Sequence, residues 1–198
     1  MTLSLIGANI VLLAKNHNPS IVSKEWLTQN KIITEQILDF THLPVISVID
    51  TNNFNLMVDQ DRLQLSLKKV DQKNLETLPQ IISKYIDQLP ETPYTTIGFN
   101  YSYRLENVQK KLKDVFLIND KRLTEIFSED YAFGGIIKFV FGDFGVTFTT
   151  DQIEDKEIRG GFNFHFKSSK RGEIIKKLSK HSETKKRSEK ILGELFHD

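Results

Sequence analysis

The most regular alternation of apolar and polar residues lies between residues 54 and 67. Phe54, Leu56 and Val58 occupy every second position, and three leucines between residues 63 and 67 do the same after Asp59-Gln60-Asp61. Period two places each apolar set on one face of a strand, and the residues between the two sets have turn composition. The stretch therefore predicts a β-hairpin.

The apolar spacing changes to three and four over residues 75–89, which indicates one face of a helix. Asn74 and Thr77 are both suitable N-caps for this helix. Pro79 favours the later start, because proline is tolerated in the first turn of a helix but not in its interior. Two further prolines after residue 89 end the helix.

A third strand follows over residues 95–105, where apolar and aromatic residues again occupy every second position. Its odd-numbered residues, among them Ile97, Phe99 and Tyr101, share one face, and its even-numbered residues share the other. Because the strand and the preceding helix each have one apolar face, we expect the odd-numbered set to be buried under residues 78–89.

Within this strand, the run IGFNYSYRL resembles a strand of a sporadically distributed family of uncharacterised prokaryotic proteins. Gly98, Tyr101 and Arg104 match the Gly, Tyr, Arg pattern of that family, and the resemblance covers about a quarter of the chain. It implies a similar strand–helix–strand order. It implies no particular chemistry.

The N-terminal third predicts two buried strands with a helix between them. Residues 3–14 are apolar on both faces, which is typical of a central strand, and VISVID at residues 45–50 is similar. Asn18 or Ser20 is the expected cap of the intervening helix. Residues 35–40 fit either a strand or a turn of helix.

The second half begins with two short helical patterns and continues as strands. Asn107 is the expected cap of the first helix, and residues 120–127 form the second. Residues 132–167 are rich in β-branched and aromatic residues, and Gly142-Asp143 has the composition of a hairpin turn. The pattern from residue 171 to the C-terminus predicts one long helix.

The two ends of this long helix are apolar, around Ile174 and around Leu192. Between them the same face carries His181, Ser182 and Lys185, which a protein core does not accept unpaired. We therefore expect the helix to dock by its ends, with a middle that crosses solvent, bridges to another chain or bends. Bridging favours a homo-oligomer over a monomer.

Together these elements predict an α+β protein with a mainly antiparallel, Phe-rich sheet, helices packed on one side, and a long basic C-terminal helix. We expect an N-terminal unit over residues 1–105 and a hairpin-rich unit over residues 106–198, sharing one core. GFNY at residues 98–101 and GFNF at residues 161–164 are alike, which indicates either an internal repeat or shared β-propensity.

Composition excludes several classes of protein. The 198 residues include no Cys, which excludes a disulfide scaffold, thiolate catalysis and cysteine-ligated metal sites. No apolar run approaches the ~20 residues that span a bilayer, and the apolar N-terminus lacks a basic region before it. We therefore expect a cytoplasmic protein with no membrane partner.

The chain carries no recognisable catalytic, cofactor or metal motif. Asp143-Phe144-Gly145 matches a kinase signature, but the phosphate loop and catalytic loop of kinases are absent. No two of the five histidines have the spacing of a helical zinc site, and acidic clusters such as Asp59 with Asp61 fall in expected turns. We predict no catalytic, cofactor-binding or metal-binding residues from sequence.

Charge is distributed unevenly along a chain whose net charge is +1. Residues 167–190 contain ten Lys and Arg against three Asp and Glu. Such a run is typical of a solvated helix with internal ion pairs, and it is also able to contact phosphates without reading bases. The residues expected to carry any polyanion binding are Lys176, Lys177, Lys180, Lys185, Lys186 and Arg187.

Three functional hypotheses follow. The first is a non-enzymatic protein-binding or assembly module with a protein partner or a second copy of itself, and it leads because catalytic motifs are missing. The second is non-specific binding of nucleic acid or another polyanion through the basic helix. The third is an enzyme whose site gathers scattered residues such as His17, Asp130 and Arg104.

Overall fold

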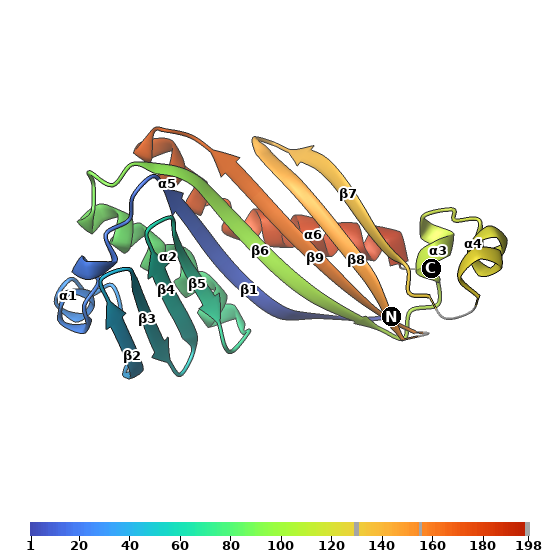
Figure 1. Cartoon of the computed structure of the whole chain (residues 1–198), viewed down its shortest axis with the longest axis horizontal. Helices are drawn as coiled ribbons and strands as arrows, with labels where there is room; N and C mark the ends of the chain where they lie inside the picture. The colour runs from blue at the N-terminus through green and yellow to red at the C-terminus, as the bar shows by residue number, and fades with distance from the viewer. Residues whose placement is uncertain (129–130, 155, 197–198) are drawn as a thin grey trace.

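The computed structural model describes residues 1–128, 131–154 and 156–196, in which nine strands form a single sheet (Figure 1). Neighbouring strands are all antiparallel, in the order β2-β3-β4-β5-β1-β6-β9-β8-β7. This confirms the α+β class and the antiparallel sheet. The strands are β1 (Thr2–Ala14), β2 (Ile37–Leu43), β3 (Ile46–Thr51), β4 (Phe54–Asp59), β5 (Arg62–Leu67), β6 (Tyr94–Glu106), β7 (Gly134–Phe141), β8 (Phe144–Glu154) and β9 (Glu157–Lys167).

Helices α2, α5 and α6 lie against one face of this sheet, behind the strands in Figure 1. The opposite face, called the open face below, carries none of them. Helices α3 and α4 lie beyond one end of the sheet. The helices are η1 (Pro19–Ile21), α1 (Lys24–Gln29), α2 (Gln72–Gln88), α3 (Leu112–Val115), α4 (Asp120–Phe127), α5 (Arg171–Leu178) and α6 (His181–Phe196).

Period-two patterns located the strands correctly. β4 and β5 form the expected hairpin, β1 is central, and residues 37–43 are a strand and not a helical turn. The odd-numbered residues of β6 are buried, as expected, but α5 and α6 cover them; α2 covers β1 and β5 instead. The strand pattern indicates that a face is buried, but it contains no information about which helix covers it.

Three expected helix starts are wrong. The Asp71 side chain caps α2 by accepting a hydrogen bond from the Asn74 backbone, so Pro79 lies inside the helix. Ser23 caps α1 in the same way. The expected start at Asn18 and Pro19 exists only as the short 3-10 turn η1, which Asn18 precedes without a side-chain cap bond. α3 begins at Leu112, after a segment in which Asn107 has a φ of 56°. Before α1 and α2 several residues have capping side chains, so the local sequence does not decide between them, whereas α3 begins after Lys111 without a side-chain cap.

The single long C-terminal helix is not confirmed, because residues 171–196 form two helices with a break after Leu178. The expectation that only the helix ends dock is wrong as well. His181, Thr184 and Ser188 in the middle of this segment are buried on the chain's own sheet. The Tyr101 hydroxyl donates to the His181 carbonyl at 2.8 Å, and the hydroxyls of Tyr103 and Ser188 lie 2.8 Å apart. Because these hydrogen bonds satisfy polar groups in the middle of the segment, its burial does not require a second chain.

The two halves of the sheet repeat the same order of elements. Each half begins with a first strand, β1 or β6, and continues with an irregular or helical segment. A meander follows, and its last strand, β5 or β9, pairs with the first strand. A helical segment, α2 or α5–α6, then lies over those two strands. The two first strands pair antiparallel with Asn9 opposite Asn100, so an approximate two-fold axis relates the halves. The sequences IGAN at residues 6–9 and IGFN at residues 97–100 are equivalent in this arrangement. GFNF, in contrast, belongs to β9, which pairs directly with β6 and is not its equivalent.

The repeat is incomplete at the two edges of the sheet. The meander of the first half has four strands, β2 to β5, whereas that of the second half has three, β7 to β9. β7 therefore corresponds to β3, and no strand of the described residues occupies the place beside β7 that β2 occupies beside β3. In the segment between β6 and β7, residues 107–128 and 131–133 are described, and they contain α3 and α4 but no strand.

Candidate protein-binding edge

β7 is an edge strand that pairs with β8 on one side and with no described strand on the other. It reverses into β8 through Gly142-Asp143, and Gly142 has a φ of 57°, which favours glycine. In a two-residue hairpin the flanking pair, here Phe141 and Phe144, exchanges both hydrogen bonds, and the pattern alternates from there. The backbone N–H and C=O groups of Ile136, Lys138 and Val140 therefore point away from β8, along the free edge.

The same three residues place their side chains on the open face. Ile136 is 67% exposed and Val140 is 75% exposed, with Lys138 between them. Natural sheets protect long edge strands with charges, prolines, bulges or a covering element. Here only one charge interrupts an eight-residue apolar edge.

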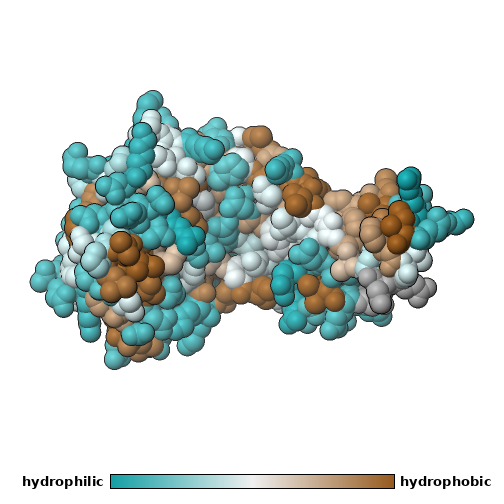
Figure 2. Space-filling model, in the orientation of Figure 1, coloured by the Kyte–Doolittle hydropathy of each residue, from teal (hydrophilic) through white to brown (hydrophobic). Residues whose placement is uncertain are grey.

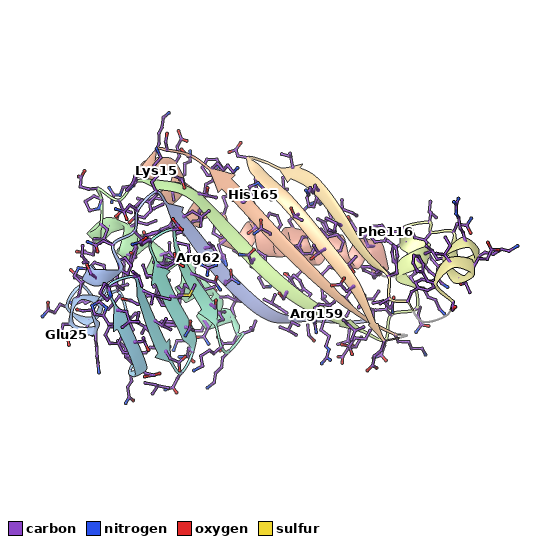
Figure 3. The ribbon with its side chains drawn as sticks, viewed as in Figure 1. Lys15, Glu25, Arg62, Phe116, Arg159 and His165 are labelled. Atoms are coloured by element: carbon purple, nitrogen blue, oxygen red, sulfur yellow. The ribbon has the colours of Figure 1, made fainter. Side chains whose placement is uncertain are left out.

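The other face of β7 is held firmly against the molecule. Phe141 packs edge-on against Phe164, and the Arg187 guanidinium lies over the Phe141 ring. Near the start of the strand, a Cβ at Gly135 would lie 2.2 Å from the Phe116 ring, so only glycine fits there (Figure 3 labels Phe116). This packing fixes the position of the edge without covering it.

Apolar surface continues beyond β7. Leu117, between α3 and α4, is 90% exposed, and Ile126 and Phe127 at the end of α4 are exposed as well. Figure 2 shows apolar patches over this end of the molecule, between more polar regions. Exposed apolar surface that continues over neighbouring elements is typical of sites that bind other proteins.

Most of the predicted polyanion-binding residues take part in contacts within the chain. Lys177 pairs with Asp143 and lies over the Phe166 ring, and Lys185 pairs with Glu189 at 2.6 Å. Lys180 pairs with Glu183, and Arg187 lies over Phe141 as described above. Lys176 and Lys186 are exposed. The polyanion-binding surface stays a prediction, on a face where much of the positive charge is already balanced.

The structure does not bring the suggested catalytic residues together. His17 is buried beyond the C-terminal end of β1, where burial lowers the pKa of its ring. The His17 ring lies 3.2 Å from the Leu12 carbonyl of β1. Arg104 lies opposite Ser4, ~26 Å from Leu12 along the strand, and pairs with Glu157. Asp130 lies outside the described residues.

The remaining candidates have local structural roles. Asp59 accepts hydrogen bonds from the backbone of Asp61 and Arg62 within the β4–β5 turn. His165 lies on the open face of β9, with its ring over Gly145 (Figure 3). Within residues 1–128, 131–154 and 156–196, no three or more acidic or histidine side chains are grouped so as to hold a metal ion. No helix in this part of the chain is long and apolar enough to cross a membrane.

Comparison with known proteins supplies no identity. A scan against protein-family models found no match, and a search of curated proteins found none either.

The β7 edge was not recognised from the sequence. GIIKFVF is apolar at both odd and even positions, which is typical of a strand covered on both sides. Its exposure depends on the strand order of the sheet, and the sequence carries no direct signal of that order.

Proposed function

We propose that this protein binds another polypeptide by adding a strand of that partner to the free edge of β7. The observation that carries the proposal is the missing counterpart of β2. In the first half β2 covers the edge of β3, whereas no described strand covers the equivalent edge of β7, where Ile136 and Val140 are exposed. Strand addition to an exposed sheet edge is a common mode of peptide recognition.

The side chains of β7 define the chemistry of the partner strand. Ile136, Lys138 and Val140 alternate along the open face, so the partner presents two apolar residues on that face with an acidic residue between them. Backbone hydrogen bonds supply affinity and these three positions supply specificity.

A second copy of the chain fits this edge less well than a different partner. In a two-fold pair that sets Ile136 opposite Val140, Lys138 of each copy lies directly opposite Lys138 of the other. Like charges in directly opposed positions destabilise strand pairing. Homo-oligomerisation through β7 is therefore an alternative outcome of the test and not the proposal.

The test uses a displayed library of random octapeptides, selected against the intact protein. Affinities of the enriched peptides are then measured by fluorescence anisotropy for the wild type, Lys138→Ala and Lys138→Pro. The alanine variant removes the charge, whereas the proline variant also removes an edge N–H without breaking the β7–β8 pairing. We expect Lys138→Pro to weaken binding by about tenfold or more, and Lys138→Ala to weaken it less.

Hydrogen exchange provides a second measurement. Peptide binding should slow exchange of the Ile136, Lys138 and Val140 amides, whereas the Ile137 and Phe139 amides are already protected by β8. Absence of any enriched peptide, or enriched peptides that bind Lys138→Pro as well as the wild type, would overturn the proposal. If light scattering shows a dimer that Lys138→Pro disrupts, the strand added to β7 comes from a second copy of the chain and not from a different partner.

A further inference from the structure

α4 is a short helix with little tertiary packing to hold it. It has eight residues, fewer than the ~12–15 that an isolated helix needs to be stable in water, and none of residues 121–128 is buried. Ile126 and Phe127 at its end are 60% and 56% exposed. Ser128, which follows, has a φ of 61°, a conformation that favours glycine. The helix therefore depends mainly on its own hydrogen bonds.

The sequence of α4 also fits a strand beside β7. Leu123, Glu125 and Phe127 occupy every second position, which gives one face of a strand two apolar residues with an acidic residue between them. The open face of β7 requires this pattern of a partner, since Lys138 lies there between two apolar residues. Three of residues 123–127 are β-branched or aromatic, types that are enriched in strands.

One register makes the opposed side chains complementary. With Glu125 opposite Lys138 in an antiparallel pair, the two charges attract, and apolar residues face each other on both sides of them. The open-face pairs are then Leu123 with Val140, Glu125 with Lys138, and Phe127 with Ile136. On the other face of the same strands, Ile126 lies opposite Ile137. The three open-face residues of β7 are also those whose backbone groups point along the free edge, so these pairs exchange the hydrogen bonds.

The internal two-fold indicates where such a strand would lie. In the first half, β2 is the element directly before β3 and pairs with its edge. In the second half, α4 is the element directly before β7, and it lies beyond the end of the sheet at which β7 begins (Figure 1). Residues 128–135, eight in all, separate the two segments in the proposed pairing, whereas a hairpin needs only two. Residues 121–127 are therefore able to reach the edge while the rest of the sheet stays in place.

We propose that residues 121–127 alternate between the helix α4 and a strand paired with β7, and that the strand form closes the partner-binding edge. The inference rests on the proposed function, because it makes this segment the intramolecular competitor of the partner strand. Closing covers exposed apolar side chains on both segments, namely Ile126, Phe127, Ile136, Ile137 and Val140. A partner binds only the helical, open form, so its apparent affinity falls as the closed fraction rises.

Disulfide trapping tests the strand form, because the chain has no cysteine of its own. Ile126→Cys with Ile137→Cys joins a directly opposed, non-hydrogen-bonded pair, whose Cβ atoms are close in the strand form. Phe127→Cys with Ile137→Cys is the matched control, because Phe127 is about as exposed on α4 but faces the opposite side of the strand. We expect the first pair to form its disulfide about tenfold faster or more under mild oxidation. Equal rates would overturn the inference.

A charge exchange tests the register. Glu125→Lys, added to the Ile126→Cys, Ile137→Cys protein, sets a like charge opposite Lys138 and should slow disulfide formation about threefold or more. Adding Lys138→Glu as well restores opposite charges and should restore the rate. Asp114→Lys on α3 makes the same change of charge outside the paired segment and should leave the rate unchanged. Rates that do not respond to the exchange would contradict the proposed pairing.

The cross-link also tests closure of the binding edge. Octapeptides enriched on the wild type are measured by fluorescence anisotropy on the oxidised and the reduced Ile126→Cys, Ile137→Cys protein. We expect oxidation to weaken their binding by about tenfold or more and to slow exchange of the Lys138 amide, and reduction to reverse both effects. Peptides that bind the oxidised protein as well as the reduced one would overturn the inference.

These measurements separate the inference from the proposed function. If peptides are enriched and Lys138→Pro weakens them, but the two cysteine pairs react at equal rates, the proposed function stands and the inference fails. If no peptide is enriched, the proposed function fails, and the disulfide rates still decide whether β7 accepts residues 121–127. Circular dichroism of the reduced proteins should match the wild type. If Ile137→Cys prevents folding, the exposed Ile136 replaces it, with Phe127→Cys then as the opposed residue and Ile126→Cys as the control.

Discussion

The burial of His181 predicts that stability falls as the pH is lowered from 7 towards 5. In the folded chain the ring is 4% exposed, and burial, then Lys185, lowers its pKa from 6.5 to about 4. Between those two values the unfolded chain binds a proton that the folded chain does not. The stabilisation is therefore complete above pH 6.5 and is lost as the pH falls towards 4.

The magnitude follows from the size of the shift. Each pKa unit corresponds to about 1.4 kcal/mol, so the full contribution of His181 is about 3 kcal/mol. Most of this change occurs above pH 5, and the linkage relation gives a loss of about 2 kcal/mol between pH 7 and pH 5. Burial also lowers the pKa of His17, so the whole protein loses stability for more than one reason over this range.

The contribution of His181 is isolated by comparison with His181→Phe, which keeps a ring beside Phe99 and Tyr101. Urea unfolding followed by circular dichroism at pH 7, 6 and 5 gives the free energy of unfolding of both proteins. We expect the wild type to lose about 2 kcal/mol more than the variant between pH 7 and pH 5. Equal losses in the two proteins, or an NMR titration that gives His181 a pKa near 6.5, would refute the reasoning.

Four further perturbations test the packing. Phe99→Ala should lower the free energy of unfolding by ~3–5 kcal/mol, because the ring is fully buried, and an unchanged thermal melt would contradict this. A double-mutant cycle of Tyr103→Phe and Ser188→Ala should give a coupling energy of about 1 kcal/mol in urea unfolding; no coupling would mean that the hydroxyls do not interact. Gly142→Ala should cost about 1 kcal/mol, from backbone strain alone since nothing lies within 4 Å of the new Cβ, and wild-type stability would disprove that strain. Deleting residues 188–198 should lower the melting temperature, because Leu192 and Phe196 are buried on the chain's own sheet. A truncated protein as stable as the wild type would instead support a helix whose C-terminal end docks outside its own sheet.

The start of α2 and the free edge of β7 were outside the reach of sequence analysis for different reasons. α2 is capped at Asp71, so it begins early enough to enclose Pro79. The capping alternatives at Asp71, Asn74 and Thr77 are close in intrinsic preference, so the local sequence does not decide between them. The edge strand has an ordinary apolar sequence, and its free side is a consequence of strand order.

The sequence alone was sufficient to locate nearly all of the strands, the β4–β5 hairpin and the turn at Gly142. Period two and turn composition are local properties, and a strand face such as Leu63 and Leu65 on β5 can be read directly from them. The tertiary structure decided what lies against each face. Tyr101 and Tyr103 pack against a polar helix segment because their hydroxyls form hydrogen bonds with groups some eighty residues later in the chain, at His181, Thr184 and Ser188. Residues with polar side chains become core residues only when a partner is present, and partners this distant are brought together by the fold, not by the pattern of neighbours along the chain.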